Sequence, residues 1–343
     1  MKVGVVGLGF LGMMHAKNIR TLPNAELAAV CDVQPHRLEG MMTAGNIDVG
    51  AGRVDLGGAK KYTRFEDMLA DSALELIVIV TPTYLHAEMA VAALKAGKHV
   101  FCEKPMARTA KEASSMLAAA KKAGRGLMIG HCLRFWPEYV AVKEMIDSKR
   151  YGRVRGATFR RIGGTPRWGF ENWFVDSKRS GHCALDMHIH DVDTAQWFFG
   201  KPSRVRAAGT VTADGGVSHV IARYDFADID MVTAEGAWFH DGYPFSMAAT
   251  IEFEQATVEY DSSKSPTLVV CRNGAKPEPQ TVPAGDAYAN EIKYFIDCLL
   301  EGKAPDRVPP ESSVDAVATV EAEMKSVKTG KPVSLARGTG AKK

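Results

Sequence analysis

Short apolar runs alternate with helical patterns over the first third of the chain. The runs show little alternation of polar and apolar positions, which is typical of strands buried on both faces. The expected strands are 2–6, 26–32, 74–82, 98–105 and 127–132, and the expected helices are 10–22, 34–44, 65–71, 85–97 and 109–124. This order of elements predicts an α/β fold with a doubly wound parallel sheet.

The pattern changes in the middle of the chain, where strands follow one another and several alternate at every second position. The expected strands are 153–162, 203–213, 217–226, 231–238, 247–254 and 256–260, and the expected helices are 183–200, 288–302 and 311–330. This predicts a second α/β domain with a large, mostly antiparallel, open sheet. We expect domains at 1–130 and 131–335, with the closing helices packing back on the first domain, and a loose tail at 336–343.

Composition narrows the class of protein. A chain of 343 residues is long enough for two cores, and a net charge of +3 is too small to indicate a nucleic-acid partner. No run reaches the roughly 18 apolar residues of a membrane span. The six cysteines are scattered without a zinc spacing, which favours a reducing cytoplasm.

A glycine motif follows the first strand. Gly7, Gly9 and Gly12 form "GLGFLG", in which Phe10 and Leu11 open the first helix. These glycines allow a tight turn, a close approach of pyrophosphate to the backbone, and close packing of helix on strand. The helix N-terminus then offers N–H groups to the phosphates. The motif predicts a dinucleotide site in a Rossmann fold, although a βαβ unit without a ligand has the same glycines.

Asp32 strengthens this interpretation because it ends the second strand. A carboxylate there accepts hydrogen bonds from the adenosine ribose and repels a 2′-phosphate, so NAD is favoured over NADP. Arg37 lies close by in the sequence and suits a phosphate, which leaves NADP open.

Two further strand ends carry polar groups. Thr81 and Pro82 end one strand and are followed by His86, and Glu103 and Lys104 end the next. Ligands lie beyond the carboxyl ends of parallel strands, so these groups are expected near the nicotinamide. An ammonium beside a substrate hydroxyl stabilises the alkoxide that develops during oxidation. The alternative is a Glu–Lys surface pair of little energetic value.

The second domain offers a base. In "GHCALDMHIHD", Asp186 and His190 are four residues apart on the predicted helix and therefore on one face. The carboxylate can orient the imidazole and stabilise its protonated form. The alternative is an Asp–His pair without chemistry. His188 and His190 point about 200° apart on a helix, so we expect no metal site.

These motifs together resemble the Gfo/Idh/MocA oxidoreductases over nearly the whole chain. The likeness includes "VGVVGLGFLGMMHA", "VTPTYLHAEMAVAALKAGKHVFCEKPMA", "SGHCALDMHIHDVDTAQWFFG" and the closing "NEIKYFIDCLLEGKAPD". The resemblance implies that His190 takes the hydroxyl proton, Asp186 orients it and Lys104 polarises the oxygen. It also implies that Glu103 lies by the nicotinamide ribose and that the second sheet forms dimers or tetramers.

The chain departs from the family pattern at Ser180-Gly181-His182, where many relatives have three glycines, so His182 is expected in the substrate pocket. Trp168, Trp173 and Arg167 are further candidates to line a sugar site, with a core or interface role as the alternative for the tryptophans. His131 and Arg134 follow a strand of the first domain and are additional candidates for the substrate pocket.

The expected function is a cytoplasmic NAD-dependent dehydrogenase that oxidises a secondary hydroxyl of a sugar, cyclitol or glycoside. Two alternatives remain open. Some relatives cleave glycosidic bonds by transient oxidation with no net redox change, and others bind ligands as sensors without catalysis.

Overall fold

Six parallel strands form the first sheet of the computed structural model, which describes residues 1–41 and 52–335. They are β1 (Lys2–Val6), β2 (Glu26–Cys31), β3 (Lys60–Tyr62), β4 (Leu76–Ile79), β5 (His99–Glu103) and β6 (Leu127–Gly130). The order is β3-β2-β1-β4-β5-β6, and every pair is parallel. From β1 to β3 successive strands are added towards one edge of the sheet, and from β4 to β6 towards the other, so the strand order reverses between β1 and β4. Open α/β sheets bind their ligands at such a point.

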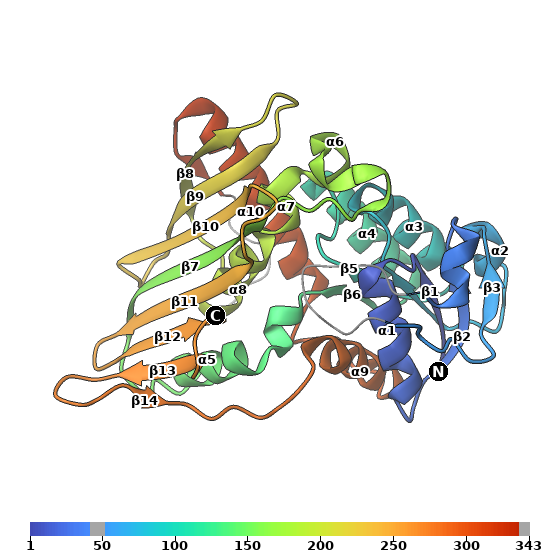
Figure 1. Ribbon diagram of the computed structural model, residues 1–343, viewed down its shortest axis with the longest axis horizontal. Coiled ribbons are helices and arrows are strands. Elements are labelled where there is room, and N and C mark those ends of the chain that lie inside the picture. The colour runs from blue at the N-terminus through green and yellow to red at the C-terminus, as the bar shows by residue number, and fades with distance from the viewer. Residues whose placement is uncertain (42–51, 336–343) are drawn as a thin grey trace. The chain divides into compact units, whose positions relative to one another are not determined.

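Helices cover this sheet in two groups. They are α1 (Phe10–Thr21), α2 (Phe65–Leu69), α3 (Thr83–Lys95), α4 (Ala110–Ala123) and α9 (Ala287–Leu300), with a 3₁₀ helix η1 (Pro35–Glu39). Helix α1 contacts α9, and α3 contacts α4, with the strands between the two pairs (Figure 1). The first compact unit comprises Met1–Cys132, Trp168–Trp173 and Asp286–Val314. The late helix α9 therefore packs with the N-terminal elements.

The second unit comprises Leu133–Arg167, Phe174–Gly285 and Asp315–Lys343. Its nine strands, in the order β14-β13-β12-β11-β7-β10-β9-β8-β15, are antiparallel except for the β7–β10 pair. They are β7 (Val154–Gly164), β8 (Arg204–Val211), β9 (Val217–Asp225), β10 (Met231–Phe239), β11 (Ser246–Phe253), β12 (Thr257–Asp261), β13 (Leu268–Cys271), β14 (Glu278–Pro279) and β15 (Val333–Ser334).

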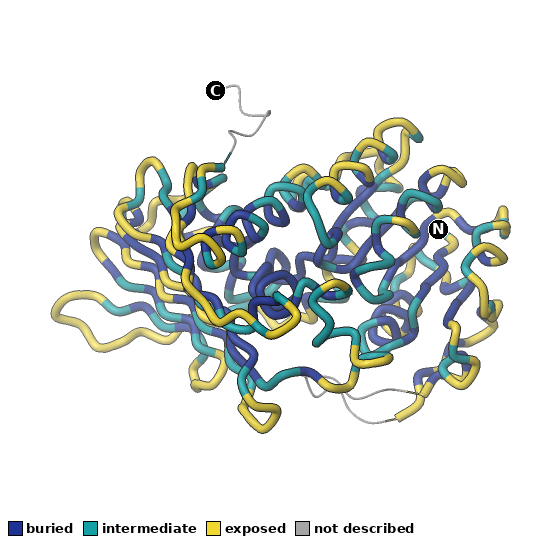
Figure 2. The backbone as a smooth tube through the Cα atoms, turned by 90° about the horizontal axis from the view of Figure 1, so that it is seen from above, coloured by how far each residue is buried: buried dark blue, intermediate teal, exposed yellow. Residues whose placement is uncertain are grey.

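One face of this second sheet is covered and the other is open. The helices are α5 (Pro137–Asp147), α6 (Ser177–Ser180), α7 (His182–Asp186), α8 (Ile189–Phe199) and α10 (Pro310–Thr329), with 3₁₀ segments η2 (Cys132–Phe135) and η3 (Phe170–Val175). Buried residues alternate with half-buried or exposed ones along much of β9 and β11. Figure 2 colours the backbone by how far each residue is buried. The parallel sheet and the mostly antiparallel open sheet confirm the fold class expected from the sequence.

The expected helix 183–200 is wrong as one continuous element. Helix α7 ends at Asp186 and α8 begins at Ile189. The N–H groups of Met187 and His188 both donate to the carbonyl of Cys183, at 3.0 and 2.9 Å, which widens the last turn and ends the helix. The spacing of four residues between Asp186 and His190 therefore does not place them on one face of one helix.

Smaller differences concern short elements. The helix expected at 34–44 is the 3₁₀ helix η1 as far as Glu39, and its last residues lie outside the described part. The tail expected at 336–343 also lies outside it. The strands β3, β13, β14 and β15 were not expected, because runs of two to four residues carry too little periodicity to predict.

Candidate active site

The glycine turn after β1 has the geometry of a phosphate-binding loop. Gly7 has φ +87°, and a Cβ at Gly12 would lie 1.8 Å from the carbonyl oxygen of Gly7. A Cβ at Gly9 would meet only Arg37, at 3.6 Å, so the backbone there is open on one side. Helix α1 begins at Phe10 without a side-chain cap. Its first N–H groups are therefore available to a pyrophosphate, and the turn fits a dinucleotide.

Asp32 connects this turn to the end of β2. One carboxylate oxygen accepts the N–H of Leu8 at 2.7 Å, and the other accepts the N–H of Gln34 at 2.8 Å. Arg37 lies beside it, with Nη1 3.7 Å from Oδ2. Each carboxylate oxygen has a further lone pair, so Asp32 can hold the turn and still accept a ribose hydroxyl. The same place has an arginine within reach of a 2′-phosphate.

His86 joins the ends of β4 and β5. Its Nδ1 lies 2.7 Å from the carbonyl oxygen of Pro105, and its Nε2 lies 2.8 Å from that of Thr81. Burial, which is the largest effect, lowers the pKa of His86, and a neutral ring donates to one of these oxygens. His86, which was expected to contact the cofactor, thus also links the two strand ends. One end carries Thr81 and Pro82, and the other carries Glu103 and Lys104. Its contact with a cofactor stays a prediction.

Glu103 points into the first unit. Its Oε1 lies 2.7 Å from Nε2 of His15 on α1, and its Oε2 accepts the backbone N–H of Lys104 at 3.1 Å. Burial is the largest single effect and raises the pKa of Glu103, but the His15 hydrogen bond and the nearby charges outweigh it and lower that pKa overall. Glu103 therefore fixes the backbone of Lys104 through this hydrogen bond, and the contact of Glu103 with a ribose stays a prediction.

The junction between α7 and α8 carries Asp186 and His190 in the second unit. Asp186 is the last residue of α7 and is buried, and His190 lies in the first turn of α8 and is half-buried. Thr194 donates its hydroxyl to the carbonyl of His190 at 2.7 Å. Lys104 belongs to the first unit, so the expectation that Lys104 and His190 share one reacting carbon stays a prediction.

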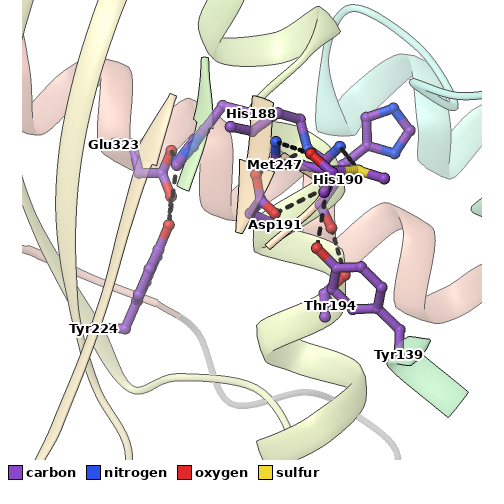
Figure 3. A network of polar contacts seen from close by, with 10 residues as sticks. Tyr139, His188, His190, Asp191, Thr194, Tyr224, Met247 and Glu323 are labelled. Atoms are coloured by element: carbon purple, nitrogen blue, oxygen red, sulfur yellow. Dashed lines mark hydrogen bonds and ion pairs between the residues drawn. The ribbon is translucent and has the colours of Figure 1, made fainter. Parts of the chain in front are cut away.

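A buried polar network underlies this junction (Figure 3). Nε2 of His188 lies 3.3 Å from Oε2 of Glu323, and the hydroxyl of Tyr224 donates to Oε1 of Glu323 at 2.6 Å. Burial, the largest single effect, lowers the pKa of His188, but the charge and hydrogen bond of Glu323 together with the charge of Asp191 outweigh it and raise that pKa overall. In Figure 3 the ring of His188 points towards Glu323, and the ring of His190 lies on the other side. The two histidine rings therefore lie in different surroundings.

Two buried arginine–aspartate pairs hold α8. Arg161 on β7 contacts both carboxylate oxygens of Asp191, at 3.0 and 3.1 Å. Arg134 contacts both oxygens of Asp193, at 2.9 and 2.7 Å. Bidentate pairs of this kind fix orientation as well as position. Arg134 was expected at a sugar site, and the structure shows it anchoring α8, so its contact with a substrate stays a prediction.

The aromatic candidates lie in different surroundings. His182 has φ +60°, unusual for a residue other than glycine, and its ring centroid is 5.1 Å from that of Trp238. Burial, the largest effect, lowers the pKa of His182. Trp168 is exposed and Trp173 half-buried, both in a segment that belongs to the first unit. Their roles at a sugar site stay predictions.

Sequence reasoning missed the residues that support the candidates. They are His15, Glu291, Asp191, Asp193, Tyr224 and Glu323, all at most 3% exposed. The signal that was available is a charged or titratable side chain among apolar helix positions, as for Glu291 in "NEIKYF". Such a residue is rarely buried without a partner.

Comparison with known proteins decides the family. Residues 1–131 match a family model described as an oxidoreductase family with an NAD-binding Rossmann fold, and residues 139–281 match the GFO/IDH/MocA C-terminal domain. The chain belongs to the Gfo/Idh/MocA oxidoreductases. This confirms the expected family, enzyme class and NAD cofactor.

Members of the Gfo/Idh/MocA family resemble the chain over most of its length. Inositol 2-dehydrogenase of Rhizobium meliloti is 28% identical over 98% of this chain and 99% of its own. Myo-inositol 2-dehydrogenase of Thermotoga maritima is 32% identical over 62% of this chain and 60% of its own. Among solved structures, levoglucosan dehydrogenase in complex with NADH and L-sorbose superposes with a TM-score of 0.84, at 19% identity over 98% of this chain and 99% of its own. That likeness shows the fold.

In the described ranges, none of this oxidoreductase's helices combines the length and the apolar character that crossing a bilayer requires.

Proposed function

We propose that the protein oxidises a secondary hydroxyl of a cyclitol or sugar to a ketone, with NAD as hydride acceptor. The observation that carries this proposal is the likeness to inositol 2-dehydrogenase over 98% of the chain. The sequence also retains Lys104, Asp186 and His190 in the motifs where the family resemblance assigns catalysis.

Each of these residues has a role that its chemistry suits. NAD, when bound at the glycine turn, supplies a two-electron acceptor. His190 takes the proton of the hydroxyl, and Asp186 stabilises the imidazolium that results. Lys104 stabilises the negative charge that develops on the oxygen. The bonds from Glu103 and His86 to the ends of β5 and β4 keep the backbone of Lys104 in place.

NAD is the preferred cofactor in this proposal because Asp32 lies at the end of β2 beside the open glycine turn. Arg37, 3.7 Å from Asp32, gives the protein some capacity for NADP. Comparing kcat/KM for the two cofactors in wild type and in Asp32→Ser tests this. We expect NAD to be favoured in wild type, and Asp32→Ser to move the preference towards NADP.

The reaction is tested by following NADH formation over a panel of cyclitols, sugars and glycosides. We expect turnover with at least one cyclitol or sugar, and a loss of about 10²–10⁴-fold in kcat for His190→Ala. Lys104→Ala should lose about 10²–10³-fold. Lys95→Ala, an exposed lysine at the end of α3, is the matched control. Activity that survives both catalytic substitutions would refute the proposed roles.

The same panel separates the alternatives. Cleavage of a glycoside without NADH accumulation, together with NAD that remains bound through purification, would replace net oxidation by redox-neutral bond cleavage. Tight binding of NAD and a sugar without turnover would indicate a sensor.

We further propose that the protein forms a homodimer or homotetramer in the cytoplasm. The copies contact one another through the open face of the second sheet. Ile221 on β9 and Met231 on β10 are each 51% exposed on this sheet. Exposed apolar side chains on a broad sheet face suit a contact with a second copy. Light scattering on the purified protein tests the assembly, and a monomer at all concentrations would contradict it.

A further inference from the structure

Three titratable side chains lie close together in the first unit, and one of them belongs to Glu103, the residue before Lys104. His15 comes from α1, Glu103 from the end of β5 and Glu291 from α9. A ring nitrogen of His15 and one carboxyl oxygen each of Glu103 and Glu291 lie within 4.8 Å of one another. His15 and Glu291 are 0% exposed and Glu103 is 4% exposed, so water does not screen their charges.

Glu291 differs from the other two because neither of its carboxyl oxygens has a hydrogen-bond partner among the residues that the structure describes. A buried carboxylate in that position would lack the hydrogen bonds that its charge requires. Burial is the largest effect that raises the pKa of Glu291 well above its ordinary value, and the charges of Glu103 and Asp286 raise it further. Two carboxyl groups this close do not both ionise readily.

Among the described residues, the charges that act on the pKa of Glu291 are those of Glu103 and Asp286, and both are negative. Tyr288, on α9, is buried and its pKa is raised, mainly by burial and then by Cys132 and Glu103, so it stays neutral. Asp286, at the N-cap of α9, accepts a hydrogen bond from Asn18 at 3.1 Å and adds negative charge. In the described part of the chain, the ring of His15, when protonated, and Lys104 are the positive groups that lower the pKa of Glu103.

A metal ion is a less suitable occupant of the His15–Glu103–Glu291 cluster than a proton. An imidazole and two carboxylates form a donor set that divalent metals accept. However, the 2.7 Å hydrogen bond between His15 and Glu103 places a proton between two of the three groups, and Oε2 of Glu103 is used by the N–H of Lys104.

We propose that Glu291 is a positioning residue that stays protonated in the folded protein. Glu103 is then the one carboxylate of the cluster and keeps its bonds to His15 and to the backbone of Lys104. An ionised Glu291 would compete for His15 and repel Glu103, and so loosen the strand end that carries Lys104. The consequence for catalysis rests on the proposed function, whereas the protonation state does not.

Glu291→Gln tests the proton directly, since an amide has nearly the shape of a protonated carboxyl group and no charge. Infrared spectroscopy of the wild type at neutral pH should show the carbonyl band of a neutral carboxylic acid, and Glu291→Gln should lack it. The exposed Glu301, just after α9, provides the matched control Glu301→Gln, which should keep the band. A wild type without this band, or a Glu291→Gln variant that keeps it, would overturn the proposal.

Stability against pH gives a second readout that a purely structural role would not change. A carboxyl group with a raised pKa in the folded state makes the fold less stable as pH rises above its unfolded value of about 4.5. Glu291→Gln removes this loss, so its folding equilibrium should gain on the wild type by up to tenfold per pH unit above that value. Glu301→Gln should show no such trend. A constant difference between Glu291→Gln and wild type across pH would contradict the proposal.

Activity and metal analysis complete the test. Glu291→Gln should keep kcat within about threefold of the wild type, because the charge of the cluster is unchanged. A loss of 10²-fold or more, or one equivalent of tightly bound divalent metal in the wild type that Glu291→Gln lacks, would show that the ionised carboxylate is needed and would overturn the proposal. Failure of the proposed function would appear differently, as wild type without turnover on any substrate while the infrared and stability results hold.

Discussion

Each unit of the molecule has a buried histidine–carboxylate cluster next to a proposed catalytic residue, and the two clusters differ in one group. In the first unit, a second carboxyl group, Glu291, lies close to His15 and Glu103 and has no hydrogen-bond partner within the described ranges. In the second unit, His188 and Glu323 are joined by a phenol, Tyr224, which donates to the carboxylate at 2.6 Å. The third member is an acid in one cluster and a hydrogen-bond donor in the other.

A histidine and a glutamate therefore have a different third group beside them in each unit, and that group affects the charges of its cluster. In the second cluster, Tyr224 donates a hydrogen bond to Glu323. Burial lowers the pKa of His188, but the charge and hydrogen bond of Glu323 together with the charge of Asp191 raise it overall. In the first cluster, burial raises the pKa of Glu291 and the charges of Glu103 and Asp286 raise it further, and we propose that Glu291 stays neutral for this reason. The proposed proton on Glu291 would therefore limit the charge of the first cluster, whereas in the second cluster Nε2 of His188 lies 3.3 Å from Oε2 of Glu323.

The largest expected effect follows from breaking the ion pair of the second cluster. Glu323→Ala leaves the buried His188 without its counter-charge and Tyr224 without its acceptor. Removal of one partner of a buried pair costs about 3–5 kcal/mol of unfolding free energy. Denaturant unfolding of the variant measures this cost, and a cost below about 1 kcal/mol would show that the pair does not organise the α7–α8 junction.

A smaller effect is expected for Tyr224→Phe, which removes one hydrogen bond to a charged group and keeps the ring. The expected loss is about 1.5–3 kcal/mol of unfolding free energy. The double variant with Glu323→Ala should lose much less than the sum of the two, because both remove the same contact. Additive losses would mean that the 2.6 Å contact contributes little.

The smallest effect concerns pH. The pKa of His188 is raised in the folded state above its ordinary value of 6.5. Its contribution to stability is therefore complete below about pH 6.5 and is lost as pH rises through the folded-state pKa. Unfolding measured from acidic to alkaline pH should show this loss in wild type and a smaller one in His188→Gln. A decline that is equal in both would assign it to other groups.

The contrast between the units also explains what the sequence allowed us to predict. Gly7, Gly12 and Asp32 were expected from local spacing, and the structure has the glycines at the turn after β1 and Asp32 directly after β2. The helix over 183–200 was predicted from an equally clear local pattern and is broken. His188 there turns inward to Glu323, a partner far along the chain, and local propensity does not contain that information.

The same limit applies to the supporting residues of the first unit. His15, Glu103 and Glu291 lie in three separate helical or strand segments, and only the fold brings α1, β5 and α9 together. Glu103 was expected from its position at a strand end, which is a local signal. Its partners were not, since pairing between distant segments leaves no mark in the spacing of either.

The central claim of the proposed function is that Lys104 and His190 act on the same reacting hydroxyl. A double-mutant cycle of Lys104→Ala and His190→Ala, measured as kcat/KM for the best substrate of the panel, tests it most directly. If both groups stabilise one transition state, the double variant should lose little more activity than the worse single variant. Losses that multiply, so that each substitution has the same effect in the presence of the other, would contradict the claim.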